Sequence, residues 1–188
     1  MRNINYYAFP DIVYEGEIPL SVEFVQGIKN DVYDAQDNQL CIAADFGWAT
    51  TPKTALGSSL RKLQRLIGAH FISTLSAHVK NITALSIQVI EPVIFNIMPG
   101  QTVLPLVETR RWYTGCTWLQ TTDTGSHLRI DAPVARIHAT PKGIATNNIV
   151  VSPADFKYVF WPSHLSAGFT QNKSMTDTKV LWFSFKTV

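Results

Sequence analysis

Histidine and carboxylate side chains are the groups of this chain that could bind a metal. His127 and His138 occupy neighbouring segments with the composition of β-strands, and Asp131 and Glu108 could lie nearby. Imidazole and carboxylate ligands suit zinc and non-haem iron. Cross-strand neighbours can bind metal, but the sequence has no His-x-His cluster. The spacing of these residues therefore permits a metal site without requiring one.

The sequence shows no other catalytic signature. It contains no Gly-x-Ser-x-Gly nucleophile elbow and no phosphate-binding loop. Its two cysteines, Cys41 and Cys116, have no histidine partner that the sequence indicates. They fit a reduced compartment or two unrelated core positions. Cys116 lies in an apolar strand, where we expect it to pack as a small hydrophobic residue.

Two stretches in the second half of the chain have the most specific pattern. Residues 158–172 read Tyr-Val-Phe-Trp-Pro-Ser-His-Leu-Ser-Ala-Gly-Phe-Thr-Gln-Asn and precede Val-Leu-Trp-Phe-Ser-Phe at 180–185. Residues 94–119 contain a turn glycine, Leu-Val-Glu, Thr-Gly and an aromatic strand. Both stretches resemble the phage-type 2-oxoglutarate/Fe(II) oxygenase-like proteins. That family has hydrophobic-Phe-Pro-Ser-x-Leu-x-His-x-Val-x-Pro-Asn in the later stretch and His-x-(acid or His) before (Ser/Thr)-Gly in the earlier one.

The resemblance implies where the three metal ligands of the family would fall in this chain. On that template the ligand positions are Leu106, Glu108 and Ala167. A non-haem iron oxygenase site uses two histidines and one carboxylate on one face of the metal. Leucine and alanine have no lone pair to donate, so only Glu108 keeps a coordinating atom. The pattern therefore favours a protein without a metal, a cofactor or catalytic residues.

Other interpretations of this region stay open. The basic residue that would bind the co-substrate carboxylate aligns nearest Val180, with Lys179 beside it. A slipped register would instead place His164, three residues before Ala167, at the histidine position. An active dioxygenase could then draw its ligands from Glu108, His164 and another histidine. A metal-free barrel that binds a small molecule at an aromatic-lined mouth is the third possibility.

Length and composition predict a single well-packed domain. The chain has 188 residues, of which 46% are hydrophobic and 16% are charged, far from the composition of disordered chains. We expect residues 1–83 to form N-terminal strands and helices and residues 84–188 to form a β-barrel core. No run approaches the ~18 apolar residues of a transmembrane helix, and the polar start is not a signal peptide. A net charge of +2 does not favour nucleic acid as a partner.

Hydrophobic periodicity predicts one long helix over residues 56–79. Apolar side chains recur there at three- and four-residue steps, at Leu60, Leu63, Ile67, Phe71 and Leu75. Ser58 or Ser59 could cap its start. The N-terminal part is further expected to contain a brief helix at 19–28, a polar turn at 31–38 and a packed loop around Trp48.

Short segments rich in β-branched and aromatic residues follow the long helix. The predicted strands are residues 84–90, 93–98, 103–107, 112–120, 127–130, 135–139, 148–151, 158–161 and 180–185. Many short strands after a helix predict two facing sheets. The expected fold class, which the resemblance also implies, is mainly β with α. It is a double-stranded β-helix (jelly roll) with one long and one or more short N-terminal helices packed on one sheet.

Charged residues are unevenly distributed along the chain. Residues 1–45 hold two basic and eight acidic residues, whereas residues 52–80 hold five basic residues and no acidic one. Two solvated faces are the plainest interpretation, and pairing within the domain or between protomers is the alternative. The candidate protein contacts are the basic helix face and the start of an aromatic strand, namely Arg61, Lys62, Arg65, Arg110, Arg111 and Trp112.

These observations favour a non-catalytic, oxygenase-like barrel that serves protein–protein assembly. Because the resemblance is to phage-encoded proteins, it implies a virion component such as a neck, tail or capsid-associated protein. The expected partners are other protein subunits in an oligomer or virion, without membrane contact. The expected location is the virion or the host cytoplasm. The low charge fits burial by partners, although a β-rich protein with a large core would show it as well.

Overall fold

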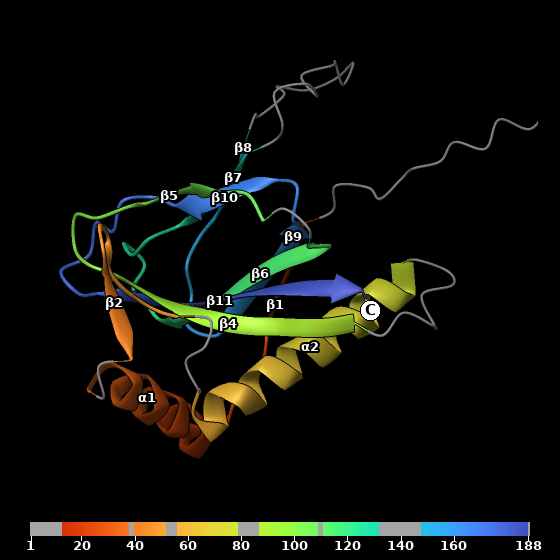
Figure 1. The fold of residues 1–188 in the computed structure, drawn as a ribbon, viewed down its shortest axis with the longest axis horizontal. Helices are drawn as coiled ribbons and strands as arrows, with labels where there is room; N and C mark the ends of the chain where they lie inside the picture. The colour runs from red at the N-terminus through yellow and green to blue at the C-terminus, as the bar shows by residue number, and fades with distance from the viewer. Residues whose placement is uncertain are drawn as a thin grey trace, which may run out of the picture.

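Two antiparallel β-sheets face each other, and two helices cover the outer face of the larger sheet (Figure 1). The computed structural model describes residues 13–37, 40–51, 56–78, 87–108, 111–131 and 148–187. This arrangement confirms the expected class, a mainly β jelly roll with helices on one sheet. Within the described residues, no helix is both long and apolar enough to cross a membrane.

The larger sheet has seven strands in the order β1-β9-β6-β11-β4-β3-β2, and the smaller sheet has four in the order β5-β10-β7-β8. In the larger sheet these are β1 Tyr14–Glu17, β9 Lys157–Pro162, β6 Tyr113–Gln120, β11 Thr178–Thr187, β4 Ile87–Ile97, β3 Gly47–Thr50 and β2 Cys41–Ala44. In the smaller sheet they are β5 Val103–Leu106, β10 Ser166–Phe169, β7 Leu128–Asp131 and β8 Asn148–Val151. The strands next to each other in both sheets pair antiparallel.

The larger sheet is apolar on both faces, so the molecule has two cores. Successive residues of a strand point to opposite faces. In β11, Leu181 and Phe183 therefore lie in the core under the helices, and Trp182 lies in the core between the sheets. Strand β9 alternates in the same way, with Phe160 under the helices and Trp161 between the sheets. We call these the helix-side core and the inter-sheet core.

Helix α2 spans Ser58–His78 and buries the predicted apolar stripe. Leu60, Leu63, Ile67, Phe71 and Leu75 are each at most 1% exposed. Its start is capped by Asp31 from the other helix, whose Oδ2 accepts a hydrogen bond from the Leu60 amide at 2.8 Å. Ser58 and Ser59 lie inside the helix, so the expectation that one of them caps it is wrong. The negative charge of a carboxylate at a helix N-terminus also stabilises the helix through its dipole.

Helix α1 spans Val22–Asp37 and is longer than expected. The Ser21 hydroxyl accepts a hydrogen bond from the Phe24 amide at 3.3 Å, which caps its start. The predicted turn at residues 31–38 is wrong, because residues 31–37 are helical. Ile28, Val32 and Ala35 form a buried stripe through this polar stretch. Packing on that narrow stripe outweighs the turn-like composition of the exposed side.

Several strand predictions change in the structure. Within the described residues, the expected strands at 84–90 and 93–98 form one strand, β4 (Ile87–Ile97), which continues past Pro92 with a register shift against β11 between Trp182 and Ser184. Trp48 lies in strand β3 rather than in a loop, and strand β10 was not predicted. The expected strand at 135–139 lies outside the described residues. A bulge lets an antiparallel ladder accept a proline, which lacks the N–H donor.

Burial in the helix-side core predicts a loss of stability at alkaline pH. Burial, together with the nearby Tyr14, raises the pKa of Tyr113 from 10.0 to about 12. The folded state thus favours the neutral phenol. The stability that comes from this preference is fully present below pH 10 and is lost as the pH rises towards about 12. We expect the free energy of unfolding to fall more steeply over this range in the wild type than in Tyr113→Phe. Urea denaturation at several pH values measures both slopes, and equal slopes would contradict the prediction.

Candidate functional site

Strands β5 and β10 bring two of the expected ligand positions together. Leu106 and Ala167 are register partners in the smaller sheet. Glu108 follows β5 by two residues. Its Oε1 accepts a hydrogen bond from Nε1 of Trp182 at 3.2 Å, and the Trp182 ring lies in the inter-sheet core with Ala167. The three positions that the resemblance implies therefore border the same end of the space between the sheets.

The side chains at these positions do not fit non-haem iron. Leu106 is 43% exposed and Ala167 is fully buried, and neither has an atom that can coordinate a metal. A facial iron site needs two histidines besides the carboxylate. A single carboxylate cannot take the place of these histidines.

Glu108 is held by groups of the protein itself. Besides the hydrogen bond from Trp182, its Oε2 lies 3.9 Å from Nε of Arg111, and both side chains are about one-third exposed. A buried indole N–H needs an acceptor, which Glu108 supplies. The surviving carboxylate thus satisfies a polar group at the rim of the core.

Large aromatic rings pack in the space between the sheets. The inter-sheet core contains Phe95, Trp118, Trp161, Phe169 and Trp182, none more than 8% exposed. Trp182 is central, with its ring centroid 5.1 Å from that of Trp161, 5.6 Å from that of Phe95 and 6.1 Å from that of Phe169. Nε1 of Trp118 donates to the Ser126 carbonyl at 3.1 Å. Among the residues that the structure describes, these buried aromatic side chains therefore occupy much of this space.

The alternative metal ligands are not brought together by the described residues. His127 precedes β7 and Asp131 ends it, so they lie roughly 13 Å apart along the strand. Asp131 also accepts a hydrogen bond from Arg129 at 2.8 Å. His164 is exposed in the turn between β9 and β10, and His138 lies outside the described residues. Those residues contain no group of three or more His, Cys, Asp or Glu side chains that could hold a metal.

Lys179 does not lie on the face of β11 that borders the space between the sheets. Val180 lies in the inter-sheet core, so its neighbour Lys179 points to the opposite face, beside α1. The position that aligns with the co-substrate-binding basic residue of the family is therefore occupied by the aliphatic side chain of Val180. The ammonium group of Lys179 is separated from the inter-sheet space by the sheet itself.

The expected interaction residues have different environments. Trp112 packs on the helix-side core, with its ring centroid 5.4 Å from that of Tyr113 and 6.4 Å from that of Phe71. Arg111 lies beside Glu108, as described above, and Arg110 lies outside the described residues. These contacts make Trp112 partly a core residue rather than a free surface anchor.

The basic face of α2 is exposed. Arg61, Lys62 and Arg65 have no carboxylate within salt-bridge distance among the residues that the structure describes. The Lys62 ammonium lies 4.9 Å from the centroid of the Phe24 ring of α1, a cation–π contact. These residues stay candidates for a contact with an acidic surface.

The strand arrangement is that of known 2-oxoglutarate/iron oxygenases. A prolyl-4-hydroxylase from Pseudomonas putida is 13% identical with a TM-score of 0.63, over 94% of this chain and 92% of that one. The viral collagen prolyl hydroxylase of Paramecium Bursaria Chlorella virus-1 is 12% identical with a TM-score of 0.60, over 94% and 96%. SnoK, a non-heme alpha-ketoglutarate-dependent carbocyclase from nogalamycin biosynthesis, is 9% identical with a TM-score of 0.69, over 93% and 79%.

At these identities the likeness shows the fold alone. No protein-family model matches the chain, and no curated protein sequence matches it. The expected oxygenase-like fold is thus supported by the solved structures. The residues of the site have to be judged by their own chemistry.

The packing around Ala167 predicts that this position cannot accept a histidine. Ala167→His would insert an imidazole at a fully buried position of a core rich in aromatic rings, and we expect the free energy of unfolding to fall by about 1–3 kcal/mol. Leu106→His, at the half-exposed register partner, is the matched control and should change it by less than about 1 kcal/mol. Urea unfolding followed by tryptophan fluorescence measures both variants. Wild-type stability of Ala167→His would show that the space is open.

Proposed function

We propose that this chain is a non-catalytic, oxygenase-like barrel that serves as a protein–protein assembly module. Its most concrete form is a phage virion structural component, such as a neck, tail or capsid-associated protein, found in the virion or the host cytoplasm. Its partners are other protein subunits. The virion role derives from the resemblance to phage-type members of the family.

The donor set supports the non-catalytic part of the proposal most directly. Two of the three ligand positions, Leu106 and Ala167, have aliphatic side chains, and the third, Glu108, is bonded to Trp182. Catalysis by this fold would need a metal and a co-substrate between the sheets, where aromatic rings are packed. The same rings give the barrel a rigid core.

Exposed aliphatic side chains support the assembly part of the proposal. Many of those in the described residues lie on or next to β5 and β8, the two edge strands of the smaller sheet, namely Leu104, Leu106, Val107, Ile149 and Val150. Edge strands with unprotected apolar side chains readily pair with or pack on another chain. By contrast, the edge strand β1 of the larger sheet carries Glu15 and Glu17. The smaller sheet is thus the surface that we expect partners to cover.

The first experiment measures the metal content of the purified wild type and of Glu108→Ala, and titrates both proteins with Fe(II) and 2-oxoglutarate. We expect no stoichiometric iron in either protein. Glu108→Ala should instead lower the free energy of unfolding by about 1 kcal/mol, because the Trp182 N–H loses its acceptor. Glu108→Gln keeps an acceptor and is the control. Stoichiometric iron that disappears in Glu108→Ala would overturn the proposal and favour an active dioxygenase.

The assembly role predicts self-association or partner binding through the edges of the smaller sheet. We expect sedimentation of the wild type to show an oligomer, and Leu104→Asp to shift it towards the monomer, because a carboxylate would then be buried in the contact. Leu104 is 74% exposed, so the monomer itself should keep its fold, which circular dichroism checks. Met175→Asp, at a side chain that is 94% exposed elsewhere, is the control. A wild type that stays monomeric with no partner would contradict the role.

A further inference from the structure

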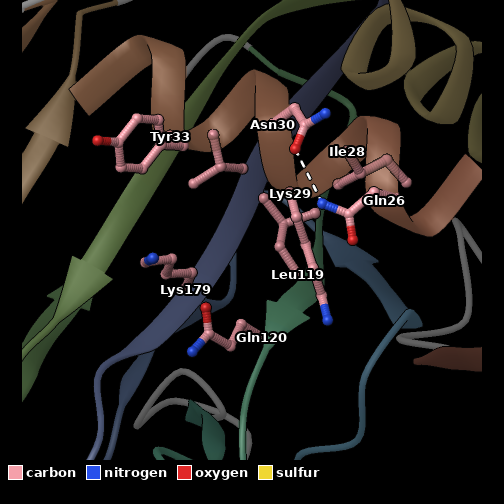
Figure 2. A pocket seen from close by; sticks show the side chains of 9 residues that line it. Gln26, Ile28, Lys29, Asn30, Tyr33, Leu119, Gln120 and Lys179 are labelled. Atoms are coloured by element: carbon pink, nitrogen blue, oxygen red, sulfur yellow. Dashed lines mark hydrogen bonds between the residues drawn. The ribbon is translucent and has the colours of Figure 1, made fainter. Parts of the chain in front are cut away.

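A hollow of about 390 Å³ lies between α1 and the adjoining ends of β6 and β11 (Figure 2). It is on the helix-covered face of the larger sheet, so it is separate from the inter-sheet core and from the expected metal positions. Helix α1 contributes Lys29, Asn30 and Tyr33, and the sheet contributes Gln120 and Lys179. Its size is that of a typical site for a small molecule.

The hollow is positively charged. Lys29 and Lys179 line it from opposite sides, and none of the described residues that line it is a carboxylate. In Figure 2 their ammonium groups lie on either side of the Gln120 carboxamide. Among the described residues, neither lysine has a carboxylate within 4.0 Å, and Asp177, which precedes Lys179 by two residues, accepts a hydrogen bond from Asn96 instead. Two like charges in a partly enclosed space favour the binding of an anion.

The other polar groups suit a ligand with hydroxyl groups. Nε2 of Gln26 donates a hydrogen bond to Oδ1 of Asn30 at 2.9 Å, which orients both amides on the helix. The Asn30 amide nitrogen and the Gln120 carboxamide can still donate, and the carboxamide oxygens can accept. Tyr33 adds an aromatic ring that is 65% exposed at the rim. Amides and an aromatic ring together can bind the polar edge and the apolar face of a sugar ring.

We propose that this hollow binds a small hydroxylated anion of the sugar-phosphate class. Lys29 and Lys179 bind the phosphate oxygens, while Asn30 and Gln120 bind hydroxyl groups and Tyr33 covers one face of the ring. Ammonium groups suit phosphate as mobile point charges, and charge-assisted hydrogen bonds are the stronger kind. The site belongs to the helix-covered face and does not depend on how the smaller sheet assembles.

The test is a titration of the full chain with glucose 6-phosphate, followed by two-dimensional NMR. We expect saturable shifts at the amide signals of α1 and of the ends of β6 and β11. Lys29→Gln and Lys179→Gln should each weaken binding by about tenfold, as expected for one lost charge-assisted hydrogen bond. Lys173→Gln removes the same charge from an exposed lysine outside the hollow and should bind like the wild type.

Glucose and inorganic phosphate separate the two parts of the ligand. Phosphate alone should bind more weakly than glucose 6-phosphate at the same signals, and glucose alone should bind weakest, because it lacks the charge. Absence of saturable shifts with glucose 6-phosphate would overturn the proposal, as would equal binding by Lys29→Gln, Lys179→Gln and the wild type. Glucose that binds as tightly as glucose 6-phosphate would contradict the anionic class. Each outcome is independent of the oligomeric state that tests the assembly role.

Discussion

Strand β11 is hydrogen-bonded to a neighbouring strand along each edge and buried on both faces, and the rest of the structure depends on its central place. Strands β4 and β6 pair with it, the helices cover one of its faces, and the smaller sheet covers the other. Because its backbone groups are paired in the ladder, the strand can bury an apolar run from Val180 to Phe183. Its charged residues, Lys179 and Lys186, lie near its two ends. The strand thus joins two cores that share one sheet.

The inter-sheet core links the packing of this protein to the alanine at one of the expected ligand positions. Cores are packed as densely as organic crystals, so large rings on one strand require small side chains opposite them. Trp161 and Trp182 are large, and Ala167 is one of the small residues in the same core. A histidine at that position would compete with the rings for volume and would need a polar partner when buried. The surviving acid, Glu108, serves the indole of Trp182 instead.

The two candidate surfaces lie on different sides of the larger sheet. The aliphatic edges of β5 and β8 belong to the smaller sheet, whereas the basic hollow lies beside α1 on the helix-covered face. Binding at one surface therefore leaves the other accessible. The basic hollow is also notable because it lies beside a helix from the most acidic part of the chain, which holds only two basic residues in its first 45 positions. A lysine there adds charge of the opposite sign to its surroundings.

Local periodicity in the sequence determined the long helix and most of the core strands, and the resemblance to the oxygenase-like family implied the positions Leu106 and Ala167. The length of α1, the strand around Trp48 and the cap that Asp31 gives to α2 were decided by tertiary contacts. The face on which Lys179 lies, and the hydrogen bond between Trp182 and Glu108, were decided in the same way. The reason is physical: periodicity reports which side of one element is apolar, because that depends on neighbours along the chain. Which groups meet across the fold depends on strand register and helix docking, and these are set by residues far apart in sequence.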